Sequence, residues 1–383
     1  MLDPAREPWL RPRAAYIHVP FCAHHCAYCD FAVATGAERN IDLYLESLEV
    51  EMASLGRPHP VETVFIGGGT PTHLSPRQLE RLIELTQRWL PGATEFSIET
   101  TPESIDREKL ALLAAGGVNR VSVGAQSFDP RTLRALDRRH SAEDVERAVR
   151  LVAAHFDNWS LDLIFGVPGQ MLADWLRDLE QAVGSAPPHV STYGLTYEKG
   201  TPLWKDRERG LVQPVGEEVE LAMYLSAIDR LAAAGLEQYE VSNHARPGWE
   251  CRHNQIYWAN FAYLGFGVGA ARYVAGRREL NTRDLTTYLR RTLSGESPTF
   301  QTEQLDPRAR AFETIAVQLR RRRGIDRASF AAQTGFELNS LAGERINRLA
   351  EQELICDDGR SIALTRRGLC LADSVIADLL AGP

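Results

Sequence analysis

Short runs of β-branched and aromatic residues alternate with longer amphipathic stretches along the first two-thirds of the chain. The short runs predict six strands, at residues 15–19, 61–66, 95–100, 120–125, 160–165 and 190–196. In the longer stretches, apolar positions recur every three or four residues, which predicts helices that include 41–55, 76–90, 106–115 and 142–154. Strands that alternate with helices are typical of a parallel sheet with right-handed crossovers. Six such units are too few for a closed eight-stranded barrel. The sequence therefore predicts the α/β class, with an open partial (β/α)6 barrel whose site lies at the carboxyl ends of the strands.

The last quarter of the chain follows a different pattern. A polar stretch begins at residues 294–298 and runs to about Asp306. The helices predicted after it are 309–322, 327–332 and 340–352. Two short strands then flank a turn at 357–359, and Thr365 is the expected cap of the last helix. We therefore expect a barrel domain over residues 1–275, a connecting segment over 276–306, and a small winged-helix-like domain over 307–383.

Composition narrows the class of protein. The chain has 383 residues, 44% of them apolar, which is enough for a large core and two domains. The net charge of −8 argues against nucleic acid as a partner. No apolar run approaches membrane-spanning length, and residues 1–13 lack the apolar core of a signal peptide. We expect a cytoplasmic protein with no membrane-spanning segment.

Three cysteines follow the first predicted strand with the spacing C-x3-C-x2-C, at Cys22, Cys26 and Cys29. Thiolates so close in sequence can converge on one soft metal centre. Three are one short of a closed four-cysteine zinc or iron–sulfur site, so a cubane cluster held by them would keep one iron open. Two alternatives remain: a disulfide framework, which a chain of this size does not need, and a zinc site completed by His24 or His25.

This cysteine spacing resembles the signature of the radical S-adenosylmethionine (radical SAM) superfamily. In that superfamily the amino and carboxylate groups of S-adenosylmethionine chelate the open iron. An electron passed from the cluster then splits the sulfonium to give a 5′-deoxyadenosyl radical. The resemblance implies a 4Fe–4S cluster on the three cysteines, S-adenosylmethionine as second cofactor, and an electron donor such as flavodoxin or ferredoxin.

Polar residues and glycines cluster where the predicted strands end. A glycine triplet at residues 67–69 follows the second strand and leaves one turn without side chains. Glu99 ends the third strand, Gln126 follows the fourth, and Arg138 lies just beyond. Asp162 lies within an apolar strand, where a carboxylate is costly unless it is paired or functional. Taken singly, each of these residues also has a structural interpretation, such as a tight turn or a solvated strand end.

Together the patterns E-x-x-P, G-x-Q-S-F, R-x-H and D-L-I-x-G-x-P resemble the oxygen-independent coproporphyrinogen III dehydrogenase group, and the resemblance covers nearly the whole chain. In that group the equivalent residues line the S-adenosylmethionine site. The resemblance thus implies a binding site made of Tyr16, Tyr28, Gly68, Gly69, Thr70, Glu99, Gln126, Arg138 and Asp162.

A histidine with two nearby aromatic residues, His253, Tyr257 and Trp258, lies beyond the predicted barrel strands. Imidazole can bind iron and aromatic rings can cover the faces of a porphyrin. From the residues alone, a hydrogen-bonded histidine between packed aromatics is the simpler interpretation. The pattern H-N-x-x-Y-W resembles the haem-binding motif of the HemW-type haem chaperones, one branch of the same group. That resemblance implies a haem site on these three residues, with Cys251 as the next candidate ligand.

Three functions remain open on this basis. They are a haem chaperone that passes haem to an acceptor such as a respiratory-chain haem protein, a coproporphyrinogen III oxidase, and a methyltransferase-type radical enzyme. The dehydrogenases of the group carry a fourth cysteine where this chain has Phe31, and the chaperones carry phenylalanine there. The segment before Tyr16 is also short. These features favour the chaperone and lead us to doubt coproporphyrinogen dehydrogenase activity. One departure concerns Gly267-Val-Gly269-Ala270, which runs into Ala271-Arg272 where the group often has a Ser-His or His-Gly pair.

Overall fold

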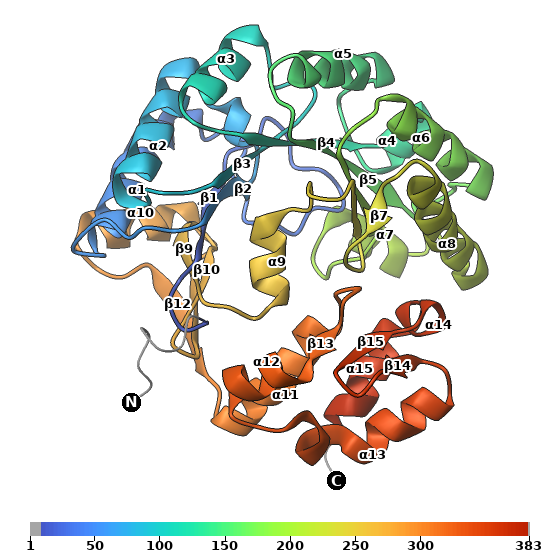
Figure 1. Cartoon of the computed structure of the whole chain (residues 1–383). Coiled ribbons are helices and arrows are strands. Elements are labelled where there is room, and N and C mark those ends of the chain that lie inside the picture. The colour runs from blue at the N-terminus through green and yellow to red at the C-terminus, as the bar shows by residue number, and fades with distance from the viewer. Residues whose placement is uncertain (1–8, 382–383) are drawn as a thin grey trace.

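A computed structural model describes residues 9–381 of the chain (Figure 1). The larger domain is built on one twelve-stranded mixed sheet that does not close into a barrel, in the order β12-β11-β10-β9-β1-β2-β3-β4-β5-β6-β8-β7. Its six central strands are parallel and follow chain order. They are β1 (Ala14–Val19), β2 (Thr63–Gly68), β3 (Glu95–Thr100), β4 (Arg120–Gln126), β5 (Trp159–Phe165) and β6 (His189–Gly194). The predicted open partial barrel of six β/α units is thereby confirmed.

Helices cover the convex face of this sheet in an arc (Figure 1). They are α1 (Ile41–Ala53), α2 (Pro76–Trp89), α3 (Arg107–Ala115), α4 (Pro130–Ala135), α5 (Ala142–Ala153), α6 (Leu172–Gly184) and α8 (Glu217–Ala233). Side chains set where several of them begin: Ser75 and Ser141 form capping boxes, and Asp106 accepts from the Lys109 N–H. The four predicted helices therefore form, and their apolar faces pack with the strands into one large core.

Strands that the sequence pattern did not reveal extend both edges of the sheet. β9 (Tyr263–Gly267) pairs in parallel with β1, and the antiparallel strands β10 (Ala271–Val274), β11 (Arg277–Asn281) and β12 (Thr299–Gln304) follow. At the other edge lie β8 (Asn243–Ala245) and β7 (Glu237–Gln238), while α7 (Pro202–Glu208) is in the loop after β6. Residues 276–306, expected as a connecting segment, thus form β11, α10 (Leu285–Leu293) and β12 and widen the main sheet.

A buried carboxylate on α1 holds this extension in place. Glu51 accepts hydrogen bonds from the Gly267 N–H at 2.8 Å, from Asn281 Nδ2 at 2.6 Å and from the Tyr288 hydroxyl at 2.6 Å. These donors come from β9, β11 and α10. A buried charge is tolerated when several donors satisfy it. One residue therefore joins α1 to three elements that lie more than 200 positions later, at sequence separations of 216, 230 and 237.

A short helix, α9 (Arg252–Trp258), lies on the concave side of the sheet (Figure 1). Its first residues contact Glu95 and its His253 contacts Thr63. Both partners are the first residues of their strands, β3 and β2. Helix α9 therefore occupies the amino-terminal end of the partial barrel, opposite the end where the sequence predicts the cofactor site.

The C-terminal domain is small and has a core of its own. Its helices are α11 (Pro307–Gln318), α12 (Arg327–Thr334), α13 (Leu338–Glu351), α14 (Arg366–Leu369) and α15 (Ala372–Leu380). Its three-stranded sheet has the order β13 (Ile325–Asp326), β15 (Ser361–Leu364), β14 (Ile355–Asp357). The predicted hairpin is confirmed. Thr365 caps α14 by accepting from the Gly368 N–H, but α15 follows, so the expectation that Thr365 caps the last helix is wrong. Among residues 9–381 no helix is long and apolar enough to cross a membrane.

Candidate functional site

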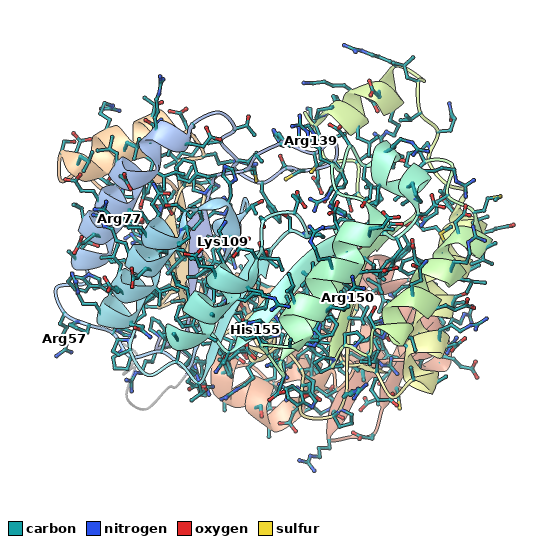
Figure 2. All side chains as sticks on the ribbon, turned by 90° about the horizontal axis from the view of Figure 1, so that it is seen from above. Arg57, Arg77, Lys109, Arg139, Arg150 and His155 are labelled. Carbon is teal, nitrogen blue, oxygen red and sulfur yellow. The ribbon has the colours of Figure 1, made fainter. Side chains whose placement is uncertain are left out.

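A cavity of about 720 Å³ lies at the carboxyl ends of the central strands. Arg139, which is labelled in Figure 2, is among the residues that line it. The cavity is within the size range of small-molecule sites. All but one of the cofactor-site residues predicted from the dehydrogenase group line it: Tyr28, Gly68, Gly69, Thr70, Glu99, Gln126, Arg138 and Asp162. The three cysteines line it as well.

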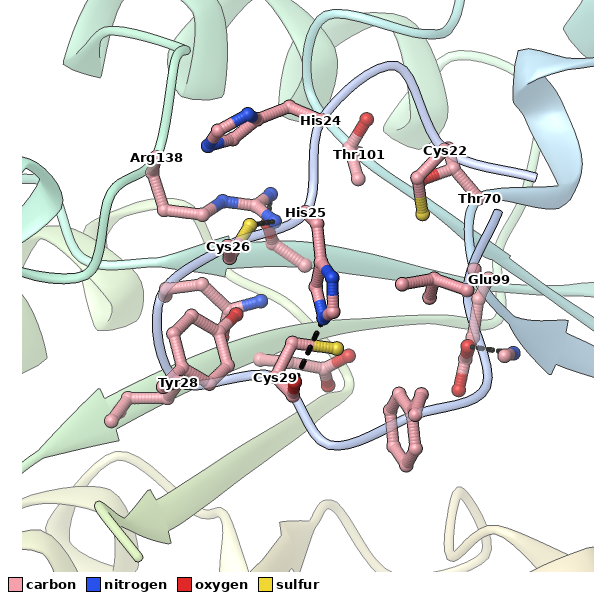
Figure 3. A pocket seen from close by; sticks show the side chains of 18 of the residues that line it. Cys22, His24, His25, Cys26, Tyr28, Cys29, Thr70, Glu99, Thr101 and Arg138 are labelled. Atoms are coloured by element: carbon pink, nitrogen blue, oxygen red, sulfur yellow. Dashed lines mark hydrogen bonds between the residues drawn. The ribbon is translucent and has the colours of Figure 1, made fainter. Parts of the chain in front are cut away.

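The cysteine loop follows β1 and is closed at its base by backbone hydrogen bonds. The Cys22 N–H donates to the Ala34 carbonyl at 3.2 Å, and the Ala34 N–H donates to the Pro20 carbonyl at 2.7 Å. Cys22, Cys26 and Cys29 carry free thiols. Figure 3 shows them on different sides of one space. Closing the loop at its base thus brings three residues of one segment around a common volume.

The donor set in the cavity fits a cluster held by three protein sulfurs. The other cysteines among residues 9–381, Cys251, Cys356 and Cys370, do not line the cavity. Phe31, two residues after Cys29, lines the cavity and is 61% exposed. A cluster bound here would therefore have three cysteine ligands, as the sequence predicts.

Polar groups next to the sulfurs suit thiolates. Thr70 Oγ1 lies 3.4 Å from Cys22 Sγ, and Arg138 Nη1 lies 3.5 Å from Cys26 Sγ. Burial raises the pKa of Cys22, and it raises the pKa of Cys29 to about 11. Deprotonation of these thiols therefore needs nearby positive charge, which Arg138 supplies in part and which bound iron would supply further.

The two histidines of the loop bond to groups other than the sulfurs. His24 Nε2 lies 2.8 Å from Asp137 Oδ2, and His25 Nε2 lies 2.9 Å from the Cys29 carbonyl. Across residues 9–381, no three or more His, Cys, Asp or Glu side chains are grouped as ligands of a single metal ion. In this structure His24 and His25 are therefore engaged by groups other than the cysteine sulfurs.

Each glycine of the triplet is required for a different close approach. A Cβ on Gly67 would lie 2.7 Å from Glu99 Oε2, and one on Gly68 would lie 2.5 Å from the His18 ring. A Cβ on Gly69 would lie 2.8 Å from the backbone of Pro20 and Phe21. Gly68 also has a φ of +106°, which other residues rarely adopt. The turn is therefore packed against both the cysteine loop and Glu99.

Glu99 faces the cavity from the end of β3. Its Oε2 accepts a hydrogen bond from the Gly68 N–H at 2.9 Å. Burial raises the pKa of Glu99 to about 7, against the opposing effect of that hydrogen bond. A carboxylate with this pKa can accept from an ammonium group and changes charge near neutral pH.

A β-bulge positions the next two predicted residues. The pairing of β4 with β5 shifts by one residue between Gly124 and Gln126, and Gln126 has a φ of +66°. Arg138 donates from Nη2 to the Gly124 carbonyl exposed at this bulge, at 2.8 Å. The bulge thus places the Gln126 side chain and the Arg138 guanidinium on the same rim of the cavity.

Asp162 lies at the base of the cavity, on β5. Its Oδ2 accepts from the Ser122 hydroxyl and its Oδ1 from the Ser191 hydroxyl, both at 2.7 Å. Burial raises the pKa of this carboxyl despite those bonds. The cost of an acid in an apolar strand is therefore offset by two serines from the neighbouring strands, β4 and β6.

Tyr16 is the predicted cofactor-site residue that does not line the cavity. Its hydroxyl lies 3.0 Å from His18 Nδ1, and its ring stacks near Phe65. Tyr193 and Leu195, for which no role was predicted, also line the cavity, at and just after the end of β6. Their position at the end of the sixth predicted strand could have indicated that they line the site, because side chains at the carboxyl ends of parallel strands converge.

The candidate haem residues lie at the opposite end of the partial barrel. His253 is 1% exposed; its Nδ1 lies 2.9 Å from Thr63 Oγ1, and its Nε2 has no hydrogen-bond partner within residues 9–381. The ring centroids of Phe65 and Tyr257 lie 5.3 Å and 4.6 Å from that of His253. Burial and the nearby Arg120 lower the pKa of His253 to about 3. A neutral imidazole with an unpartnered nitrogen is a suitable iron ligand, but this ring is fully enclosed.

Trp258 and Cys251, the other candidate haem residues, have different neighbours from His253. Trp258 is half-buried and lies toward Glu240. Cys251, the second candidate ligand, is completely buried, and its Sγ lies 3.6 Å from Glu95 Oε1. The structure therefore brings His253 and Tyr257 together and leaves Trp258 on another side of α9.

Comparisons with known proteins identify the family and the fold. Residues 16–182 match the Radical SAM superfamily, and residues 305–371 match the HemN C-terminal domain. The chain is 36% identical to the haem chaperone HemW of Bacillus subtilis, over 96% of this chain and 99% of that protein. It is 36% identical to the haem chaperone HemW of Mycobacterium tuberculosis H37Rv, over 97% and 95% of the two chains. It is also 32% identical to the mitochondrial radical S-adenosyl methionine domain-containing protein 1 of Bos taurus, over 97% and 88%.

Among solved structures, the coproporphyrinogen III oxidase HemN of Escherichia coli superposes with a TM-score of 0.84, over 97% of this chain and 90% of that one. The two sequences are 22% identical, so the similarity establishes a shared fold. Both domains of the present chain are included in that superposition.

Proposed function

We propose that this chain, which belongs to the HemW family of radical SAM proteins, is a haem chaperone that also carries a 4Fe–4S cluster with exchangeable S-adenosylmethionine. Haem is its cargo, bound and then passed to an acceptor protein. Three further points remain predictions: an acceptor such as a respiratory-chain haem protein, an electron donor such as flavodoxin or ferredoxin, and a cytoplasmic location.

The observation that carries the cofactor part of the proposal is the single cavity that gathers Cys22, Cys26 and Cys29. Three thiolates would hold the cluster, which supplies an iron with an open coordination position when bound. Glu99 can accept from the ammonium group of S-adenosylmethionine. Asp162, held by two serines, can accept from a hydroxyl of its sugar. The glycine turn lets the backbone approach a ligand between the cysteine loop and Glu99.

The haem part of the proposal depends on His253. Nδ1 of this residue pairs with the Thr63 hydroxyl. When the proton is on Nδ1, this hydrogen bond leaves a lone pair on Nε2, as a metal ligand requires. Because the ring is enclosed by Phe65 and Tyr257, haem can reach it only if α9 moves away from the sheet. We therefore propose that the structure described here is the closed state of the haem site.

Phe31 favours the chaperone over a coproporphyrinogen III dehydrogenase. The dehydrogenase remains the second candidate, because HemN shares the fold over nearly the whole chain. A phenylalanine at this position supplies no sulfur for an additional ligand. We expect no conversion of coproporphyrinogen III to protoporphyrinogen IX. Product above that of a Cys22→Ala control would support the dehydrogenase, and a methylated product would support a methyltransferase-type enzyme.

Anaerobic reconstitution tests the cofactor site. We expect a 4Fe–4S spectrum that changes when S-adenosylmethionine is added, and loss of stable loading on replacement of Cys22, Cys26 or Cys29 by Ala. Cys356→Ala is the matched control, because this free thiol lies outside the cavity. A cluster retained by the triple variant would refute the ligand assignment, and zinc in place of iron would support the zinc site.

Haem titration of the cluster-loaded protein tests the motif. His253→Ala should weaken haem binding at least about tenfold or shift the Soret band, because the iron loses its ligand. His244→Ala is the control: this histidine is also buried, with its Nδ1 unpartnered and its pKa lowered to about 3, but it lies outside the motif. Equal affinity and spectra in both variants would show that the motif is structural here.

A further inference from the structure

A polar interior separates the cavity from α9. Ser122 faces the concave side of the sheet, since it donates to Asp162 at the base of the cavity. Arg120 lies two residues earlier on the same strand and so faces the same side. Two residues of a strand span about 7 Å, which places Arg120 one layer deeper, toward the end where α9 lies.

Arg120 is charged and buried, and one of its nitrogens has no hydrogen-bond partner. Its side chain is 2% exposed, and the unpartnered atom within residues 9–381 is Nε. A guanidinium has five N–H donors and keeps its charge at any ordinary pH. An arginine in this state is costly unless water or a weakly held carboxylate compensates it.

The two carboxylates around Arg120 are already engaged by other donors. On the cavity side, Asp162 accepts from two serine hydroxyls. On the α9 side, Glu95 accepts from the N–H groups of Arg252 and His253, both at 2.9 Å. Burial lowers the pKa of Arg120, but nearby acidic groups that include Glu95 and Asp162 outweigh this effect and raise it. Arg120 is therefore shared between an acid at the cavity and an acid that holds the first turn of α9.

Further unpartnered atoms lie around the same interior. Ser97 Oγ belongs to the cross-strand neighbour of Arg120, and His189 lies on β6 two residues before Ser191, which faces Asp162. Ser97 Oγ, His189 Nδ1 and His253 Nε2 all lack partners within residues 9–381, and all three residues are buried. Buried polar groups of this kind are normally satisfied by ordered water. The interior around Arg120 therefore contains several buried polar atoms that no group within residues 9–381 satisfies.

We propose that Arg120 is a positioning residue that couples occupancy of the cavity to release of α9, and hence to access to His253. The inference rests on the proposed function, because it assumes that S-adenosylmethionine occupies the cavity. A ligand hydroxyl that donates to Asp162 satisfies this carboxylate and weakens its attraction for Arg120. The guanidinium then moves toward Glu95 and competes with the N–H groups of Arg252 and His253. Helix α9 opens more easily as a result.

Hydrogen exchange of the full-length, cluster-loaded protein without haem tests this coupling. S-adenosylmethionine should raise the exchange rate of amides in residues 253–258 at least about fivefold, within the usual range of coupling between two sites. In Arg120→Met the increase should fall below about twofold. Arg120→Lys keeps the charge and should retain most of the response. Arg134→Met, an exposed arginine on α4, should respond like the wild type. Amides of α5 serve as an internal reference.

Several outcomes would overturn the proposal. An Arg120→Met variant that responds like the wild type would exclude the coupling role, and so would a wild type whose α9 does not respond. If Arg120→Met does not fold, Arg120→Gln replaces it, because an amide can hydrogen-bond in the interior without charge, and its response should also be lost. The cluster spectrum of each sample reports binding of S-adenosylmethionine. If that spectrum does not change, the inference fails together with the proposed function, whereas a spectral change without an α9 response refutes the coupling alone.

Discussion

At the scale of single residues, the site depends on small and charged groups that would be costly elsewhere. Gly68 combines a positive φ with a close approach to the His18 ring, so two constraints meet at one position. Glu99 also contacts this turn, because its carboxylate accepts a hydrogen bond from the Gly68 N–H. The glycine turn and the acid are therefore one unit, although 31 residues separate Gly68 from Glu99 in sequence.

Mutation can separate the two reasons for glycine at position 68, namely the positive φ and the close approach of the His18 ring. Gly68→Ala should lower the free energy of unfolding by about 3 kcal/mol or more, because the new methyl group meets the His18 ring and the φ is strained. Gly169→Ala should cost only about 1 kcal/mol, since φ is +78° there and no atom lies within 4 Å of the added Cβ. Chemical denaturation measures both. Equal losses in the two variants would mean that the contact with His18 is unimportant.

Binding of S-adenosylmethionine should depend on pH through Glu99. Burial raises the pKa of Glu99 to about 7, and a ligand ammonium group prefers the ionised form. Below pH 7 the carboxyl must lose a proton before it can pair, so affinity should fall by up to about tenfold per pH unit. Titrations of wild type and Glu99→Gln at pH 6 to 8 measure this. Glu99→Gln should bind S-adenosylmethionine weakly, and its affinity should depend less on pH. If its affinity depends on pH as that of the wild type does, Glu99 does not bind the ligand.

At the scale of elements, α9 is held at both ends by groups from other parts of the chain. The Glu95 carboxylate accepts from the N–H groups of Arg252 and His253 at its start, which a helix of seven residues cannot satisfy internally. Two side chains of the C-terminal domain, Gln318 and Gln333, donate to the Ala259 carbonyl at its end. The helix therefore keeps its position by these contacts rather than by its own propensity.

Loss of the charge at the start of α9 should loosen this element selectively. Glu95→Gln weakens two charge-assisted hydrogen bonds, which we expect to cost about 2 kcal/mol of local stability. That energy corresponds to roughly 30-fold faster amide exchange in residues 252–258. Glu62→Gln is the control: its carboxylate pairs with Arg13 at the partly exposed surface near the same end of the sheet. If both variants exchange alike, Glu95 does not anchor α9.

At the scale of the whole molecule, the C-terminal domain closes the amino-terminal end of the partial barrel (Figure 1). Gln333 donates to the carbonyls of Ala259 and Asn260 at 3.0 Å and 3.1 Å and accepts from Gln318 at 2.9 Å. Asn260, which has a φ of +53°, donates to Thr314 on α11. The two domains thus meet at the residues that follow the candidate haem motif.

Loosening this contact should favour the open state of the haem site. Gln333→Ala leaves two buried carbonyls with fewer donors, which costs about 1–3 kcal/mol. We expect faster haem binding in stopped-flow measurements, with an unchanged S-adenosylmethionine affinity because the cavity lies at the other end. Gln352→Ala, an exposed glutamine of the same domain, should behave like the wild type. A haem association rate unchanged in Gln333→Ala would show that this contact does not limit access.

Local periodicity was sufficient to predict the parallel strands, the helices between them and the helical C-terminal domain. Each of these elements is specified by residues within one segment, and the crossover rule then fixes the order of the strands. The three cysteines belong to a single loop, so their convergence was also predictable from their spacing. The strands β7 to β12 were missed because they are short or polar, and distant residues such as Glu51 hold several of them.

The sequence by itself determined the six-stranded framework and the chemistry of the cysteine loop, because both are encoded by patterns within short segments of the chain. Only the tertiary structure decided that His253 is enclosed at the end of the barrel opposite the cysteines. That placement comes from Thr63 and Glu95, which lie 190 and 158 residues away from His253. No local pattern encodes contacts over such distances. They form only when folding brings α9 against the first residues of β2 and β3, where its backbone donors find a buried carboxylate.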